Sequence, residues 1–100
     1  MKKLFISQPM NGKTDEEIKE ERKDIVKRVT ERFGDVGVID SFIEENAPNS
    51  ANAGLWYLGK SLELLANADC AYFSDGWNNY RGCKIEHECA VQYGVNIVGE

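Results

Sequence analysis

The stretch DCAYFSDGWNNYRGCKIEHECAVQYGVNIV, residues 69–98, contains a complete strand–helix–strand unit. An apolar run over residues 69–73 predicts a buried strand, and residues 95–98 predict a second one. Between them lie a polar loop over residues 74–81 and a helical pattern over residues 82–93. Two strands joined by a helix in this way predict parallel strands with a right-handed crossover.

The preceding residues show the same alternation. Short apolar runs at residues 4–6 and 36–40 predict two further strands, and residues 14–33 and 55–68 have helical spacing. Strands that alternate with helices predict an α/β fold, here a flavodoxin-like or Rossmann-like open parallel sheet of about four strands with helices on both faces. Ligands of such sheets bind beyond the carboxyl ends of the strands, so the loops that follow the strands are the candidate site.

The first helix has clear end signals. Thr14 and Glu17 fit a capping box at its start, and Gly34 fits a C-terminal stop. The charged residues over 19–32 are expected to form a solvated face of this helix. Residues 41–54 have no clear period and predict a loop, and loops of this length are often functional or disordered.

Length and composition limit the function classes. The 100 residues are 42% hydrophobic and 29% charged, which suits a single domain over residues 1–100. With 17 acidic and 12 basic residues the net charge is −5, which disfavours nucleic acid as a partner. No apolar run approaches the roughly 20 residues that span a bilayer, so no membrane partner is expected. The three cysteines predict reduced thiols and a cytoplasmic protein, because they are too few and uneven for a disulfide framework.

Glu86 is the most informative residue of the third helix. A helical wheel places it between Ala90 and Tyr93, in the arc of apolar positions and within the first turn or so of the helix. The apolar arc consists of Ile85, Cys89, Ala90 and Tyr93. The polar neighbours expected to face solvent are Lys84, His87 and Glu88. An inward carboxylate is costly unless it is paired or lines a cavity. Two alternatives follow, a buried glutamate bonded to the backbone or to Arg81, and a positioned nucleophile or general base.

A family resemblance rests on several short motifs. Residues 82–86 (GCKIE), after the Ala68-Asp69 strand start and the Asp75-Gly76 loop, resemble the nucleoside 2-deoxyribosyltransferase family and its nucleotide N-glycosidase relatives. In that family a turn of this kind presents the catalytic glutamate at the start of a helix. Residues 6–12 (ISQPMNG), together with Gly76-Trp77 and residues 81–87, resemble a compact bacterial and phage subgroup of the same superfamily.

The resemblance implies retaining transfer or hydrolysis of the N-glycosidic bond of a nucleoside or nucleotide. Glu86 would attack C1′ of the sugar and form a covalent ester, which agrees with the general logic of retaining enzymes. No metal and no cofactor are expected, because the sequence offers no metal-ligand set or cofactor loop around Glu86. The resemblance implies a homo-oligomer in which a neighbouring subunit helps to close the site. The residues expected to contact substrate are Ser7, Gln8, Pro9, Met10, Asn11, Ser61, Trp77, Arg81 and Gly82.

The sequence departs from the family pattern at Ser61, where family enzymes usually carry an aspartate. A serine hydroxyl is a poor proton donor at neutral pH, and Asp75 or Asp40 would have to replace that aspartate. One alternative is therefore a catalytically silent module of the same fold that binds a nucleotide or sugar phosphate. Another is an oligomerising accessory protein, favoured by three aromatic residues expected to be exposed: Trp56, Trp77 and Tyr80.

Metal and thiol chemistry are disfavoured by spacing. Cys83 and His87 share one side of the predicted helix, whereas Cys89 faces the other way, so one metal ion cannot collect all three. His87 also points away from Cys89 and cannot activate it as a nucleophile. Trp77, in a polar loop, predicts either base stacking or a packing contact.

Overall fold

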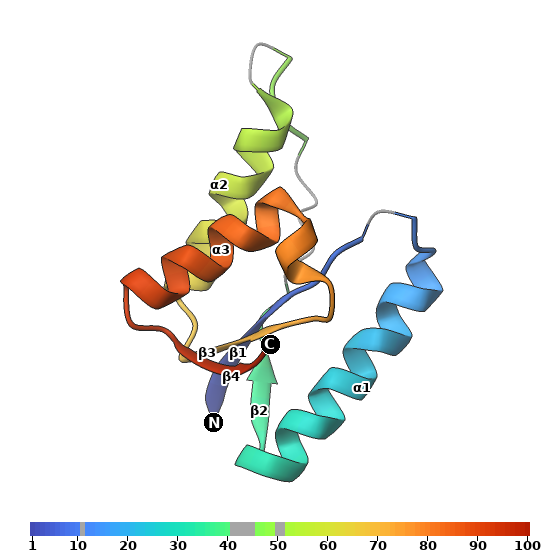
Figure 1. Ribbon diagram of the computed structural model, residues 1–100, viewed down its shortest axis with the longest axis vertical. Coiled ribbons are helices and arrows are strands. Elements are labelled where there is room, and N and C mark those ends of the chain that lie inside the picture. The colour runs from blue at the N-terminus through green and yellow to red at the C-terminus, as the bar shows by residue number, and fades with distance from the viewer. Residues whose placement is uncertain (11, 41–45, 50–51) are drawn as a thin grey trace.

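Four parallel strands form one sheet in the order β2-β1-β3-β4. The computed structural model describes residues 1–10, 12–40, 46–49 and 52–100 (Figure 1). Its elements are β1 (Lys2–Ser7), α1 (Asp15–Phe33), β2 (Val36–Val38), α2 (Ala53–Ala66), β3 (Cys70–Phe73), the 3₁₀ turn η1 (Trp77–Asn79), α3 (Arg81–Gln92) and β4 (Asn96–Gly99). The predicted α/β fold is confirmed.

The helices cover both faces of the sheet, as predicted. On one face Leu4 and Ile6 of β1 pack against Ile25 and Val29 of α1. On the other face Phe5, Ala71 and Phe73 pack against Leu65 of α2 and Ala90 of α3. Figure 1 shows α1 on one side of the strands and α2 with α3 on the other. Successive residues of each strand alternate between these two cores because side chains of a strand point to opposite faces.

The start and end of α1 follow the predicted signals. Thr14 accepts a hydrogen bond from the Glu17 N–H at 3.1 Å, and the Glu17 carboxylate accepts one from the Thr14 N–H, which completes the capping box. Gly34 closes the helix with φ of 90°, in the region that a residue without Cβ adopts at little cost. The capping box and the glycine stop are both confirmed.

The second strand is shorter than predicted. β2 pairs only through Val36, Gly37 and Val38, which lie opposite Lys2, Lys3 and Leu4 of β1. The Ile39 N–H still donates to the Leu4 carbonyl at 2.8 Å. Of the predicted 41–54 loop, residues 41–45 and 50–51 lie outside the described residues.

Helix α2 begins at Ala53, two positions before the predicted start, because Asn52 caps it by accepting from the Leu55 N–H at 3.1 Å. The Tyr57 hydroxyl accepts a hydrogen bond from the Ala47 N–H at 3.3 Å and so ties the helix to the preceding loop. The N-terminal half of α2 extends beyond the sheet (Figure 1). None of the described helices combines the length and apolarity needed to cross a membrane.

Candidate functional site

The carboxyl ends of β1 and β3 form the switch point of the sheet, where the strand order reverses. Successive strands are added on opposite sides of this central pair, which is where open α/β sheets bind ligands. The Ser74 N–H donates to the Ser7 carbonyl at 2.9 Å and holds the two strand ends together. Because alternate residues face opposite ways, Ser7 points toward α3, and Gln8 and Ser74 point toward α1.

On the α3 side, Ser7 and Glu86 form a buried pair. The Ser7 hydroxyl donates to Glu86 Oε1 at 2.6 Å. Ser7 is 2% exposed and Glu86 7% exposed. The predicted inward orientation of Glu86 is therefore found, and its partner is the hydroxyl that ends β1.

The Glu86 carboxylate forms no ion pair with the Lys, Arg or His residues that the structure describes. Arg81 is exposed at the first position of α3, so the alternative in which Arg81 neutralises Glu86 is wrong. Among the described side chains, Gln8 Oε1 is the one fully buried polar atom that lacks a partner. The second oxygen of Glu86 has no hydrogen-bond partner among the described residues and is not among these fully buried atoms, so it keeps some contact with its surroundings outside the packed core.

Cys83 lies one turn before Glu86 on the same helix face. Its side chain is buried, and this burial raises the pKa of the thiol. The Ser7 hydroxyl lowers that pKa and the Glu86 carboxylate raises it, which places both groups close to the sulfur. A buried thiol with a raised pKa is a poor nucleophile, so Cys83 packs beside the carboxylate rather than sharing its chemistry.

On the α1 side, Ser74 and Glu21 form a second serine–glutamate pair. The Ser74 hydroxyl donates to Glu21 Oε1 at 2.6 Å, and Lys13 Nζ lies 2.7 Å from Glu21 Oε2. Gln8 joins this side by donating from Nε2 to the Ile18 carbonyl at 3.0 Å. Sequence reasoning assigned Glu21 to the solvated face of α1, and that assignment is wrong. Glu21 lies about 40° from Ile25 on a helical wheel, so the periodicity that identified Glu86 also contained this signal.

Lys13 and Ser74 keep Glu21 ionised. Burial by itself raises the pKa of Glu21, but the hydrogen bonds from Lys13 and Ser74 and the charge of Lys13 outweigh it. The pKa of Glu21 consequently lies below its ordinary value of 4.5. An ionised carboxylate that is already paired serves structure better than proton transfer at neutral pH.

An aromatic cluster lies beside the α3 side of the site. The ring of His87 stacks on Trp77, with centroids 4.0 Å apart and planes 10° apart, and contacts Phe73 edge-on at 4.8 Å. His87 Nε2 also pairs with the Glu100 carboxylate. The expectation that His87 faces solvent is wrong, because Trp77, from η1, covers one face of its ring. Trp77, Tyr80 and Trp56 are each half-buried, so the expectation that they are exposed is also wrong.

The inward face of α3 differs in detail from the predicted arc. The buried residues of the helix are Cys83, Glu86 and Ala90. Ile85 is 36% exposed and Tyr93, which caps the helix, is 85% exposed. Glu86 is the sixth residue of α3 and lies in its second turn, farther from the helix N-terminus than predicted.

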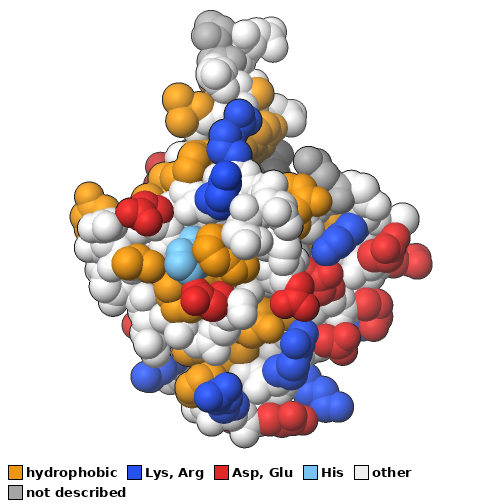
Figure 2. All heavy atoms as spheres, in the orientation of Figure 1, with side chains coloured by type: hydrophobic (Ala, Val, Ile, Leu, Met, Phe, Trp, Pro, Cys, Tyr) orange, Lys and Arg blue, Asp and Glu red, His pale blue; other side chains and the backbone are white. Residues whose placement is uncertain are grey.

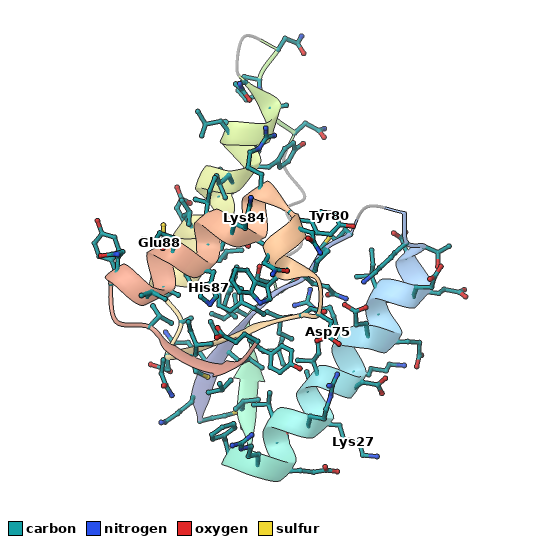
Figure 3. The ribbon with its side chains drawn as sticks, in the orientation of Figure 1. Lys27, Asp75, Tyr80, Lys84, His87 and Glu88 are labelled. Carbon is teal, nitrogen blue, oxygen red and sulfur yellow. The ribbon has the colours of Figure 1, made fainter. Side chains whose placement is uncertain are left out.

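The other predicted site residues are scattered around this edge. Pro9 is buried, Met10 is 47% exposed, and Gly82 is exposed at the start of α3. Asp75 is exposed on the loop after β3, toward α1 in Figure 3, and makes no hydrogen bond or ion pair with Glu86. Ser61 is half-buried on α2. Asn11 lies outside the described residues.

Two of the grooves formed by described residues lie between different helices and strands. One, of about 630 Å³, lies between the start of α1 and the end of β2 and is lined by Met10, Asp15, Ile18, Lys19, Arg22, Val38 and Asp40. Burial lowers the pKa of Arg22, and the nearby Asp40 carboxylate opposes that shift. The other groove lies between α2 and α3 and is lined by Leu62, Leu65, Ala66, Cys89, Tyr93 and Val95. Glu86 lines neither of these two grooves.

The chain is an open parallel α/β protein with helices on both faces of its sheet. Beside its central strands lies a buried carboxylate that is hydrogen-bonded to Ser7 and forms no ion pair with any described residue. Residues 2–99 match the family described as Domain of unknown function (DUF4406). Because this match spans almost the entire chain, the chain belongs to that family. No curated protein matches the chain, and no solved structure matches it either.

Proposed function

We propose that the chain binds a nucleoside or nucleotide at the carboxyl ends of β1 and β3 and transfers or hydrolyses its N-glycosidic bond through Glu86. One observation carries the proposal: Glu86 is 7% exposed, Ser7 holds one of its oxygens at 2.6 Å, and no cation among the described residues forms an ion pair with it. A buried carboxylate without a cation is costly to the fold, and such groups cluster at functional sites.

The proposed reaction has two steps. A Glu86 oxygen attacks C1′ of the sugar, the C1′–N bond breaks with its electron pair going to the base, and the departing base takes up a proton. Water or the nitrogen of a second base then attacks C1′ and releases Glu86. Both steps pass through a transition state with positive charge at C1′, which a nearby carboxylate stabilises.

Ser7 acts in this proposal as a positioning residue. Its hydroxyl fixes Glu86 Oε1 and leaves Oε2 as the attacking atom. Asp75, which directly follows Ser74 at the end of β3, is the proposed proton donor to the departing base. Glu21 is excluded from that role because Ser74 and Lys13 already occupy its two carboxylate oxygens.

A catalytically silent nucleotide-binding module is favoured by two other observations. Glu86 lines neither groove, and Ser61 occupies the place of the aspartate that the resemblance implies. In this second proposal the same strand ends bind a nucleotide or sugar phosphate without turnover. The three free cysteines are compatible with the proposed cytoplasmic location for either function.

The test is base release from a panel of ribo- and deoxyribonucleosides and their 5′-monophosphates, followed by chromatography. Glu86→Gln is compared with Glu88→Gln, which changes an exposed acid on the same helix. Turnover lost only in Glu86→Gln supports the nucleophile, and a sugar adduct on the wild-type chain in intact-mass spectra would identify the ester. Base release that persists in Glu86→Gln contradicts it. Ligand-induced thermal stabilisation without turnover supports the binding module.

A further inference from the structure

The groove between α1 and β2, which is called the α1–β2 groove, is formed by one helix face and two strand ends. Its helix side consists of residues at intervals of three, one and three, which share one side of α1: Asp15, Ile18, Lys19 and Arg22. Its strand side lies at the carboxyl ends of β1 and β2 and consists of Met10, Val38 and Asp40. Open parallel sheets bind ligands at this end of their strands. The volume of about 630 Å³ also suits a small molecule, since such sites measure about 300 to 1,000 Å³.

The α1–β2 groove lies apart from Glu86. Helix α1 covers the face of the sheet opposite to the one that α3 covers (Figure 1). Glu86 belongs to α3 and does not line the groove. Of the lining residues, only Met10 belongs to the substrate contacts that the family resemblance implies. A ligand of this groove would therefore be a second ligand of the protein, and the inference does not depend on the proposed glycosyl transfer.

Three apolar side chains from three segments line this groove. Met10 is 47% exposed, Val38 is 40% exposed and Ile18 is half-buried. Because they line one hollow, an apolar group placed among them would remove all three from water together. The groove therefore suits a ligand with an apolar body.

The charged side chains of the groove are two acids and two bases, so their charges sum to zero. Arg22 is half-buried, and the Asp40 carboxylate lies close enough to oppose the effect of burial on the Arg22 pKa. Asp15 and Lys19 are exposed, and neither forms an ion pair with a residue that the structure describes. An acid four positions before a lysine is the favourable order for a pair on a helix, but these two groups lie apart. Figure 2 shows both acidic and basic side chains over α1.

A groove with separate acidic and basic groups disfavours a ligand of one charge sign. An organic anion attracted by Lys19 would be repelled by Asp15, and an organic amine attracted by Asp15 would be repelled by Lys19. A zwitterion is attracted by both residues. Residues four apart on a helix have Cβ atoms about 5 to 6 Å apart, so their charged ends can reach the two sides of a head group that has an ammonium and a carboxylate on one carbon.

We propose that the α1–β2 groove binds a small zwitterion with an apolar body, of the chemical class of an apolar or aromatic α-amino acid. The carboxylate of this ligand contacts Lys19, and its ammonium group contacts Asp15. Its side chain lies among the three apolar residues of the groove. The two head-group contacts are separable, because a different side chain makes each of them.

The first test titrates the full chain with three probes that have the same apolar body: L-phenylalanine, 3-phenylpropionate and 2-phenylethylamine. In two-dimensional ¹⁵N NMR spectra, L-phenylalanine is expected to shift the amides of residues 15–22 and 38–40. It is expected to bind about tenfold more tightly than either single-charge probe. If neither L-phenylalanine nor L-leucine binds up to its solubility, the proposal is overturned. A single-charge probe that binds as tightly as L-phenylalanine would overturn the zwitterion as the ligand.

Variants of α1 assign the two head-group contacts. Lys19→Gln is expected to weaken the binding of L-phenylalanine and 3-phenylpropionate about fivefold or more, but not that of the amine. Asp15→Asn is expected to weaken the binding of L-phenylalanine and 2-phenylethylamine, but not that of the carboxylate. The matched control is Lys23→Gln, which changes an exposed lysine of α1 outside the groove and should leave all three affinities unchanged. Circular dichroism checks that each variant is folded, and equal effects of Lys19→Gln and Lys23→Gln would overturn the proposed contact.

A competition experiment separates this groove from the site at Glu86. Adding a nucleoside 5′-monophosphate is expected to leave L-phenylalanine bound. Displacement of the amino acid would assign the groove to the substrate and overturn the second site. Because binding is measured without base release, the result does not change if Glu86 proves inactive.

Discussion

The two faces of the sheet carry the same chemical pair at the same edge, with different surroundings. On the α3 face a strand-end serine holds Glu86, and on the α1 face a strand-end serine holds Glu21, each with an oxygen–oxygen distance of 2.6 Å. Glu21 has Lys13 at 2.7 Å, whereas Glu86 forms no ion pair in the part of the chain that the structure describes. The serine therefore does not distinguish the two carboxylates, and the presence or absence of a neighbouring charge does.

This difference separates structure from chemistry. A paired carboxylate has its charge satisfied by the protein and stabilises the fold through that pairing. A buried carboxylate without a cation has hydrogen-bonding and charge interactions that the chain does not satisfy, and such a group is a candidate to bind or react with a ligand. The comparison thus assigns the fold-supporting role to Glu21 and keeps the proposed reaction for Glu86.

The largest expected effect is on turnover. Glu86→Gln should lower base release by at least about 1,000-fold, because the amide cannot form the glycosyl ester. Glu21→Gln should retain activity within about tenfold, since this carboxylate is already occupied by Lys13 and Ser74. Initial rates of base release from the best substrate in the panel measure both. Equal losses in the two variants would remove the distinction between the faces.

The reverse order is expected for stability at neutral pH. Glu21→Gln should reduce the free energy of unfolding by about 1 to 2 kcal/mol, because it weakens two charge-assisted hydrogen bonds. Glu86→Gln should change it by less than about 0.5 kcal/mol or increase it, because an uncompensated buried charge is removed. Urea unfolding of both variants against wild type gives the two differences. A larger loss for Glu86→Gln would show that its charge supports the fold.

The contribution of α1 to the stability of the fold can be weakened without changing Glu21 or Glu86. Thr14→Ala removes the side-chain cap of α1 and should cost about 1 kcal/mol of stability. Base release should be unchanged, because the α3 face does not depend on this cap. Thermal unfolding and turnover assays on the same preparation check both expectations, and a parallel loss of turnover would link α1 to the reaction.

The smallest expected effect is the part of the pH dependence of the unfolding free energy that the titration of Glu21 causes. Its folded-state pKa is lowered, so its contribution is present above the ordinary value of 4.5 and is lost as pH falls through the folded pKa. Unfolding free energies measured from neutral pH to below that value should decrease for wild type. Glu21→Gln should show a shallower decrease, and an identical pH profile would contradict the assignment.

The fold was largely predictable because its signals are local. Apolar runs marked the strands, and the spacing around Ile25 and Val29 marked α1 with its cap and stop. The order of strands and helices along the chain then restricted the topology to a parallel sheet. The errors concerned the ends of elements and the burial of single side chains, namely Glu21, His87, Trp56, Trp77 and Tyr80.

The candidate site was predictable only in part. The wheel of α3 identified Glu86 as inward, but the arc around it was misjudged because Tyr93 lies past the helix end. The partners of Glu86 and Glu21 were not predictable. Ser7 is 79 positions from Glu86, and Ser74 is 53 positions from Glu21, and no periodicity connects residues so far apart.

The sequence alone determined the α/β alternation, the capping of α1 and the inward position of one glutamate on α3. These features depend on interactions between residues a few positions apart, which spacing reveals. The tertiary structure decided which glutamate receives a lysine and which is left with only a serine. That outcome depends on β1 and β3 lying side by side and turning successive side chains to opposite faces, a geometry that exists only once the chain has folded.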